Sequence, residues 1–130
     1  MKSQHPAKKG GEETFVPKFD AQGLLTAIVM ESSTGKILMV AHMNREALQA
    51  TQKNRKATFF SRSRKKIWVK GETSGNFMEV QEILVDCDQD CVLLRVRLPA
   101  GGVACHTGAK SCFFRRWKPD EDGTLEILPD

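Results

Sequence analysis

Residues 77–98 have the sequence FMEVQEILVDCDQDCVLLRVRL, and this stretch decides the fold. Apolar and polar side chains alternate from Phe77 to Val85 and again from Val92 to Leu98, a pattern typical of half-buried β-strands. The segment DCDQD, residues 86–90, lies between the two runs and is predicted to connect them. Its aspartates repel one another unless a cation neutralises them. The stretch therefore predicts two strands joined by a candidate metal site.

Further strands are predicted on the N-terminal side. Residues 24–32 (LLTAIVMES) and 36–43 (KILMVAHM) flank the turn signal SSTG and predict a hairpin. Two short strands are predicted at 57–61 and 65–71, followed by a polar loop at 71–76 (GETSGN). A glycine-rich loop is predicted at 99–112, and a final strand or packing segment at 113–117 (FFRRW).

One helix is predicted between these strands. Asn44 can cap its N-terminus, and Met43 and Leu48 are spaced as a hydrophobic staple. The helix should cover Arg45 to Lys53, with Ala47, Leu48 and Thr51 on its inner face. We therefore expect a mainly β fold with an α+β tendency, a compact mixed-sheet domain with one clear helix near 44–53.

Length and composition are those of one globular domain. The chain has 130 residues, of which 40% are hydrophobic and 28% charged. No apolar run approaches the roughly 20 residues that cross a bilayer, and the N-terminus lacks the apolar centre of a signal peptide. We expect a disordered tail at 1–16, the domain at 17–118, a short acidic tail at 119–130 and a cytoplasmic location.

The four cysteines are more typical of metal ligands, nucleophiles or buried apolar residues than of disulfides in a reducing cytosol. A closed zinc site with four cysteines is one reading. However, six residues separate Cys105 from Cys112, which is too wide for a zinc knuckle. In an extended strand Cys87 and Cys91 would lie roughly 13 Å apart, too far to share an ion. The spacing therefore favours three ligands.

A calcium loop fits the aspartates only at its start. Asp86, Asp88 and Asp90 match the first acidic positions of an EF-hand. Its sixth position requires glycine and is Cys91, and its twelfth requires glutamate and is Arg97. These mismatches exclude the EF-hand.

Two different ions side by side form the third reading. Thiolates suit zinc and carboxylates suit magnesium. Alternation along an extended stretch would turn the three aspartates to one side and Cys87 to the other. With Cys105 and Cys112, Cys87 would complete a three-thiolate zinc site whose open fourth position can hold a water. The alternative is that the aspartates decorate a solvated turn.

Basic residues gather between Arg55 and Lys70, where there are seven Lys or Arg and no carboxylate. This charge favours a phosphorylated partner. With Phe59, Phe60 and Trp68 the stretch could be a nucleic-acid surface, a solvated strand with edge lysines, or a site for a small nucleotide with more than one phosphate.

Four motifs in order closely resemble the phosphoribosyl-AMP cyclohydrolase family: SRSR, W-x-K-GETSGN, VDCDQD and ACHTGAKSCFFR. The resemblance runs from about Leu24 to Arg116. It implies hydrolytic opening of the N1–C6 bond of the adenine ring in N1-(5-phosphoribosyl)-AMP, the third step of histidine biosynthesis. The product would be the phosphoribosyl-formimino aminoimidazole carboxamide ribonucleotide.

The resemblance also implies site residues and an assembly. One Zn²⁺ per subunit is shared across an intertwined homodimer, and Mg²⁺ is held by carboxylates. The implied zinc ligands are Cys87, Cys105 and Cys112, and the implied magnesium ligands are Asp86, Asp88 and Asp90. The substrate carries two phosphates, and the residues implied to bind it are Arg62, Arg64, Trp68, Lys70, Thr73 and Ser74.

Zinc-bound hydroxide attacking C6 is the first step that zinc deaminases also use, but their H-x-E…P-C-x-x-C signature is absent here. His106 follows a zinc ligand and is our first choice for proton transfer, with Glu72 or Lys70 as weaker candidates. His42 and His5 have no such neighbour.

Cys91 stands where the family has a small apolar residue and is expected to pack without binding metal, while His42 replaces an aromatic residue. The short acidic end predicts a monofunctional enzyme. As partners we expect the nucleotide substrate and a second copy of the chain, with no nucleic acid and no membrane. The alternatives are a zinc-stabilised nucleic-acid-binding module and a zinc nucleotide deaminase.

Overall fold

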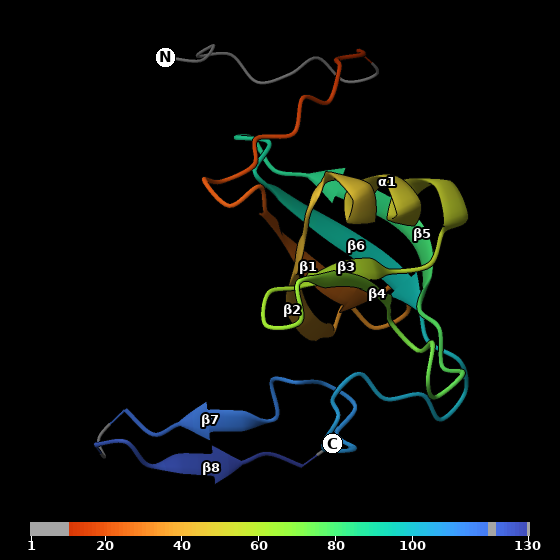
Figure 1. The fold of residues 1–130 in the computed structure, drawn as a ribbon. Helices are drawn as coiled ribbons and strands as arrows, with labels where there is room; N and C mark the ends of the chain where they lie inside the picture. Colours follow the sequence, from red (N-terminus) through yellow and green to blue (C-terminus); the bar gives the residue numbers. More distant parts are fainter. Residues whose placement is uncertain (1–10, 120–121, 130) are drawn as a thin grey trace.

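The computed structural model describes residues 11–119 and 122–129. At its centre lies a four-stranded sheet with the order β2–β1–β6–β5 (Figure 1). β1 and β6 are parallel, whereas the two outer pairs are antiparallel hairpins, so the sheet is mixed as predicted. The strands are β1 (Leu25–Glu31), β2 (Ile37–Met43), β5 (Glu79–Val85) and β6 (Cys91–Arg97).

Helix α1 (Arg45–Asn54) begins where the sequence predicts. The Asn44 side chain accepts a hydrogen bond of 2.8 Å from the backbone N–H of Ala47, which satisfies one of the free donors of the first turn. Ala47, Leu48 and Thr51 are buried, and so is Met43 ahead of the cap. The predicted helix and its inner face are therefore confirmed.

A second hairpin, β3 (Thr58–Ser61) with β4 (Lys66–Val69), packs beside the helix. Phe59 is fully buried, and its ring centroid lies 5.2 Å from that of Trp68 on β4. The core is made of side chains from the sheet, α1 and β3, among them Ala27, Val29, Leu94, Ala47 and Phe59.

The C-terminal strands β7 (Arg115–Trp117) and β8 (Leu125–Ile127) form a separate antiparallel pair. Figure 1 shows this hairpin standing clear of the central sheet. Strand β8 was not predicted, because the acidic segment that contains it has only a short apolar pattern. Trp117 is 66% exposed and Ile127 73% exposed, so the hairpin presents large apolar side chains to solvent.

The parallel pairing of β1 and β6 places two loops at opposite ends of the sheet. Thr26 is opposite Cys91 and Glu31 is opposite Val96, so both strands run the same way. Residues 86–90 precede β6, whereas the glycine-rich loop follows it. A strand of this length spans about 20 Å. The ends at which the two loops join β6 are therefore separated by about this distance. Within residues 11–119 and 122–129, no helix is long and apolar enough to cross a membrane.

Candidate metal and nucleotide site

The carboxylate loop, Asp86–Asp90, is a tight turn between β5 and β6. The Asp86 carboxylate accepts hydrogen bonds of 3.1 Å from the backbone N–H groups of Asp90 and Cys91. Gln89 adopts a left-handed conformation at φ 63°, which reverses the chain. The stretch is therefore not extended, and the turn, rather than the expected strand alternation, brings the carboxylates together.

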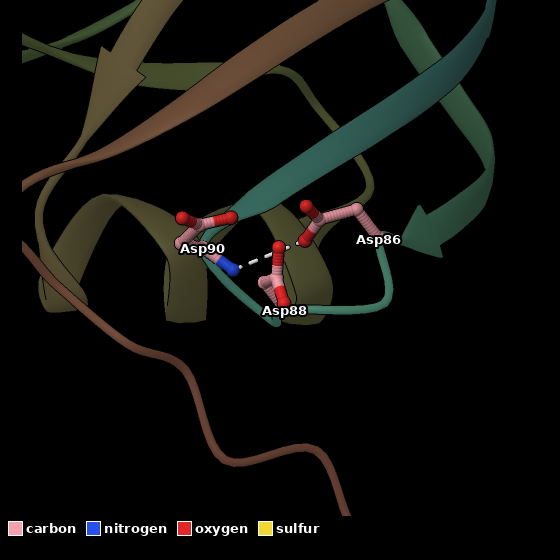
Figure 2. A group of neighbouring side chains, drawn as sticks. All are labelled: Asp86, Asp88 and Asp90. Carbon is pink, nitrogen blue, oxygen red and sulfur yellow. Dashed lines mark hydrogen bonds between the residues drawn. The ribbon is translucent and has the colours of Figure 1, made fainter. Parts of the chain in front are cut away.

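Figure 2 shows the carboxylates of Asp86, Asp88 and Asp90 gathered on one side of this turn. One ligand oxygen from each lies within 4.8 Å of the others, so the group could hold a metal ion. Oxygen ligands at such spacing suit a hard divalent cation. These residues fit the cation that the sequence predicts here.

The ionisation of the loop is uneven. Burial disfavours the charged form of Asp86, but hydrogen bonds from Asp90, Cys91 and Gln89 outweigh it and lower its pKa. The pKa of Asp90 is raised, chiefly by its interaction with the Asp86 carboxylate and also by burial and the nearby negative charges. Two neighbouring carboxylates thus share a site in which ionising both is unfavourable without a cation.

The N-terminal segment braces this loop. The backbone N–H of Val16 donates to the Gln89 side-chain carbonyl at 2.9 Å, and that of Lys18 donates to the Gln89 backbone carbonyl at 2.8 Å. Phe15 and Phe19 pack against the core. Residues 1–10 of the predicted tail lie outside the described residues.

The thiol loop, Ala104–Cys112, is folded against the other end of the sheet. Its own backbone closes it, because Ala104 N–H donates to the Lys110 carbonyl at 2.9 Å. Cys112 N–H donates to the carbonyl of Leu38 at 2.7 Å, and the Ser111 hydroxyl donates to that of Ile37 at 2.6 Å. These bonds attach the loop to the start of β2.

Cys105 and Cys112 interact with each other across this loop. The Thr107 hydroxyl donates to the Cys105 sulfur at 3.1 Å and is the main cause of the lowered pKa of Cys105; Cys112 and the charge of Lys70 lower it further. Burial, together with the neighbouring Cys105, raises the pKa of Cys112. A thiol whose pKa is lowered, beside a second thiol, is a suitable start for a zinc site.

Cys87 does not lie with this pair. It is exposed on the carboxylate loop, before β6, whereas Cys105 and Cys112 follow β6. Among the described residues, no group of three close ligands includes a thiol. A single chain therefore brings together two of the three predicted zinc ligands.

Cys91 is half-buried at the start of β6. Burial and the charges of Asp86 and Asp90 raise the pKa of its thiol. Cys91 is not part of the group of close ligands that the three aspartates form.

A pocket of about 510 Å³ lies along β4 and the loop that follows it. The predicted substrate residues that line it are Arg64, Trp68, Lys70, Thr73 and Ser74, together with the candidate proton-transfer residue Glu72. Arg62 instead lines a neighbouring pocket that contains His42. His106 is exposed on the thiol loop.

The pocket and the thiol loop touch through Lys70. Its ammonium group donates a hydrogen bond of 2.6 Å to the carbonyl of Ala104, next to Cys105. Sequence reasoning missed this contact, because no local pattern links β4 to a loop so much later in the chain. It also missed the hydrogen bond from Thr107 to Cys105, although these residues are two positions apart. The geometry therefore joins a basic, aromatic pocket to a thiol pair.

Comparison with known proteins shows the family of this chain. Residues 39–114 match the family model described as phosphoribosyl-AMP cyclohydrolase. A phosphoribosyl-AMP cyclohydrolase of Sphingopyxis alaskensis is 55% identical over 118 residues, covering 91% of this chain and 90% of the relative. A phosphoribosyl-AMP cyclohydrolase of Chelativorans sp. is 55% identical over 109 residues, covering 84% of this chain and 78% of the relative. One of Brucella anthropi is 52% identical over 116 residues, covering 88% of this chain and 82% of the relative. The chain belongs to the phosphoribosyl-AMP cyclohydrolase family.

Proposed function

We propose that this protein hydrolyses the N1–C6 bond of the adenine ring in N1-(5-phosphoribosyl)-AMP, the third step of histidine biosynthesis. The observation that carries the proposal is the junction of two features at Lys70: the pocket along β4 and the thiol pair. The pocket supplies cations and an aromatic ring, as a nucleotide with phosphates and a base requires. The thiol pair adjoins this pocket, because Lys70 of the pocket is bonded to Ala104 next to Cys105, and this supports a hydrolytic metal there.

The ligands of both ions follow from this proposal. Cys105 and Cys112 hold zinc together with Cys87 from a second copy of the chain, and the carboxylate loop holds magnesium. Zinc with an open coordination position lowers the pKa of a bound water toward neutrality. Thiolate ligands require a reducing compartment, which supports a cytoplasmic location.

The other pocket residues bind and orient the substrate. Arg64 and Lys70 face its phosphates as cations, while Trp68 stacks on the purine. Thr73 and Ser74 donate hydroxyl hydrogen bonds from the loop after β4, and Arg62 extends the positive surface beside the pocket. His106 transfers the proton to the opening ring, because it follows Cys105 directly; Glu72 and Lys70 are the alternatives.

A homodimer follows from the position of Cys87. The two loops lie at opposite ends of one sheet, so the third thiol must come from another subunit. The face of the sheet turned away from α1 supports such an assembly: Ile28 pairs with Val40 and Leu93, and Leu93 pairs with Leu84. Val40 is 45% exposed and Leu84 43% exposed. A contiguous apolar surface of this kind is typical of an interface.

An absorbance assay with phosphoribosyl-AMP tests the proposal. The purified protein should open the ring without releasing ammonia, lose turnover when a strong chelator removes zinc, and require added magnesium. A folded, zinc-loaded protein that is supplied with magnesium and shows no turnover would contradict the proposed activity. Release of ammonia would indicate a nucleotide deaminase instead.

A further inference from the structure

Glu31 is a buried carboxylate that neither the pocket nor the carboxylate loop uses. It ends β1 on the strand's buried face, and its side chain is only 11% exposed. The Lys110 ammonium group lies 2.9 Å from its carboxylate, and the Thr34 hydroxyl donates to it at 2.8 Å. These two contacts lower the pKa of Glu31, with Lys110 as the larger cause. Glu31 is therefore a charged partner for Lys110.

Lys110 belongs to the thiol loop, between its two cysteines. Its backbone carbonyl accepts the hydrogen bond from Ala104 that closes the loop. The residues after it, Ser111 and Cys112, bind the backbone of β2. The ion pair thus holds Lys110 to the end of β1, while the hydrogen bonds hold the next two residues to β2.

The loop needs such an attachment. It follows the glycine-containing segment PAGG, which gives the backbone wide conformational freedom. Ordering a free loop around a metal costs conformational entropy, and this cost reduces the measured affinity. An attachment that exists before the metal arrives removes part of that cost.

We infer that Glu31 and Lys110 form a positioning pair that sets the thiol loop for zinc. The inference rests on the proposed zinc site. It assigns to Glu31 an effect on zinc affinity, exerted through Lys110 and not through contact with metal or substrate. Breaking the pair should weaken zinc binding and leave magnesium binding at the distant carboxylate loop unchanged.

The test is the zinc affinity of the metal-free full-length protein, measured by competition with a chromophoric chelator at one fixed protein concentration. Glu31→Gln should weaken zinc binding about 10-fold, as loss of groups that support a ligand does. Thr34→Val removes only the second contact and should weaken it about threefold. Lys110→Arg keeps the ion pair and should retain the affinity.

The matched control is Glu79→Gln, which removes the same charge from an exposed pair with Arg97, at 2.7 Å on β5 and β6. It should leave zinc affinity unchanged. A double variant with Lys110→Gln added to Glu31→Gln should lose no more than either single variant, since the two residues act as one unit.

Each result of these zinc-affinity measurements supports or overturns the positioning role of Glu31. Zinc affinity that is equal in Glu31→Gln and wild-type protein would overturn the positioning role and leave the proposed function standing. Equal losses in Glu31→Gln and Glu79→Gln would also overturn it, because the effect would then be general destabilisation. A wild-type protein that binds no zinc would overturn both. If Glu31→Gln does not fold, the graded pair Thr34→Val and Lys110→Arg still decides.

Discussion

The carboxylate loop and the thiol loop differ in how much of a metal site one chain completes. Asp86, Asp88 and Asp90 come from one turn, and that turn alone gathers them. Cys105 and Cys112 meet in the other loop, but the third predicted thiol, Cys87, lies at the opposite end of the sheet. The carboxylate group is therefore gathered within one chain. The thiol site needs residues from both ends of a strand, so its completion depends on how two chains assemble.

The largest effect is expected at the carboxylate loop. Asp88→Asn removes a charge without touching the hydrogen bonds that close the turn, so the protein should fold, keep its zinc and lose magnesium. Turnover should fall about 100-fold or more, the scale of losing a preorganised charge. Parallel measurements of zinc content, magnesium affinity and turnover check this, and full turnover in the variant would refute a role for the loop in catalysis.

Asp86→Ala sharpens the contrast within the same loop. Its carboxylate accepts two backbone hydrogen bonds in addition to any metal. Loss of these should lower the free energy of unfolding, in addition to the lost magnesium affinity. Denaturant unfolding of the metal-free variants should therefore separate Asp86→Ala from Asp88→Asn; equal stabilities would show that the turn does not need its carboxylate.

The next effect is expected at the pocket beside the thiol loop, from Gly71→Ala. Gly71 has φ +92°, and an added Cβ would overlap the backbone carbonyl of Asn76. The substitution should raise KM, because the loop that carries Thr73 and Ser74 must shift, and leave magnesium affinity unchanged. Gly75→Ala is the control: its φ is +82°, but nothing lies near its Cβ. It should cost only about 1 kcal/mol of backbone strain. Equal KM values for the two variants would count against this account of the pocket.

These regions also show what the sequence can predict. The hairpin of β1 and β2, the connection of β5 to β6 and the helix cap at Asn44 depend on neighbouring residues, and local patterns identified them. The parallel pairing of β1 with β6 brings together segments far apart in the chain, and no local pattern encodes it. The same holds for the contacts of Lys70 with Ala104 and of Glu31 with Lys110. Strand β8 was missed because three residues carry too little periodicity.

The smallest effect is expected at Cys91. It is half-buried at the start of β6 and is not part of the group of three carboxylates. Cys91→Ala should retain zinc, magnesium and turnover, with a stability change within about 1 kcal/mol for a half-buried side chain. Loss of zinc from this variant, measured by metal analysis, would contradict this prediction and support a zinc site with four cysteines.

Subunit complementation tests most directly the claim that the thiol site is divided between chains. Cys87→Ser and Cys105→Ser should each abolish turnover. Unfolded together in equal amounts and refolded, they should regain about a quarter of wild-type activity, because about half of the dimers are mixed and each mixed dimer has one intact site. No recovery, in mixtures shown to contain mixed dimers, would contradict a site shared between subunits.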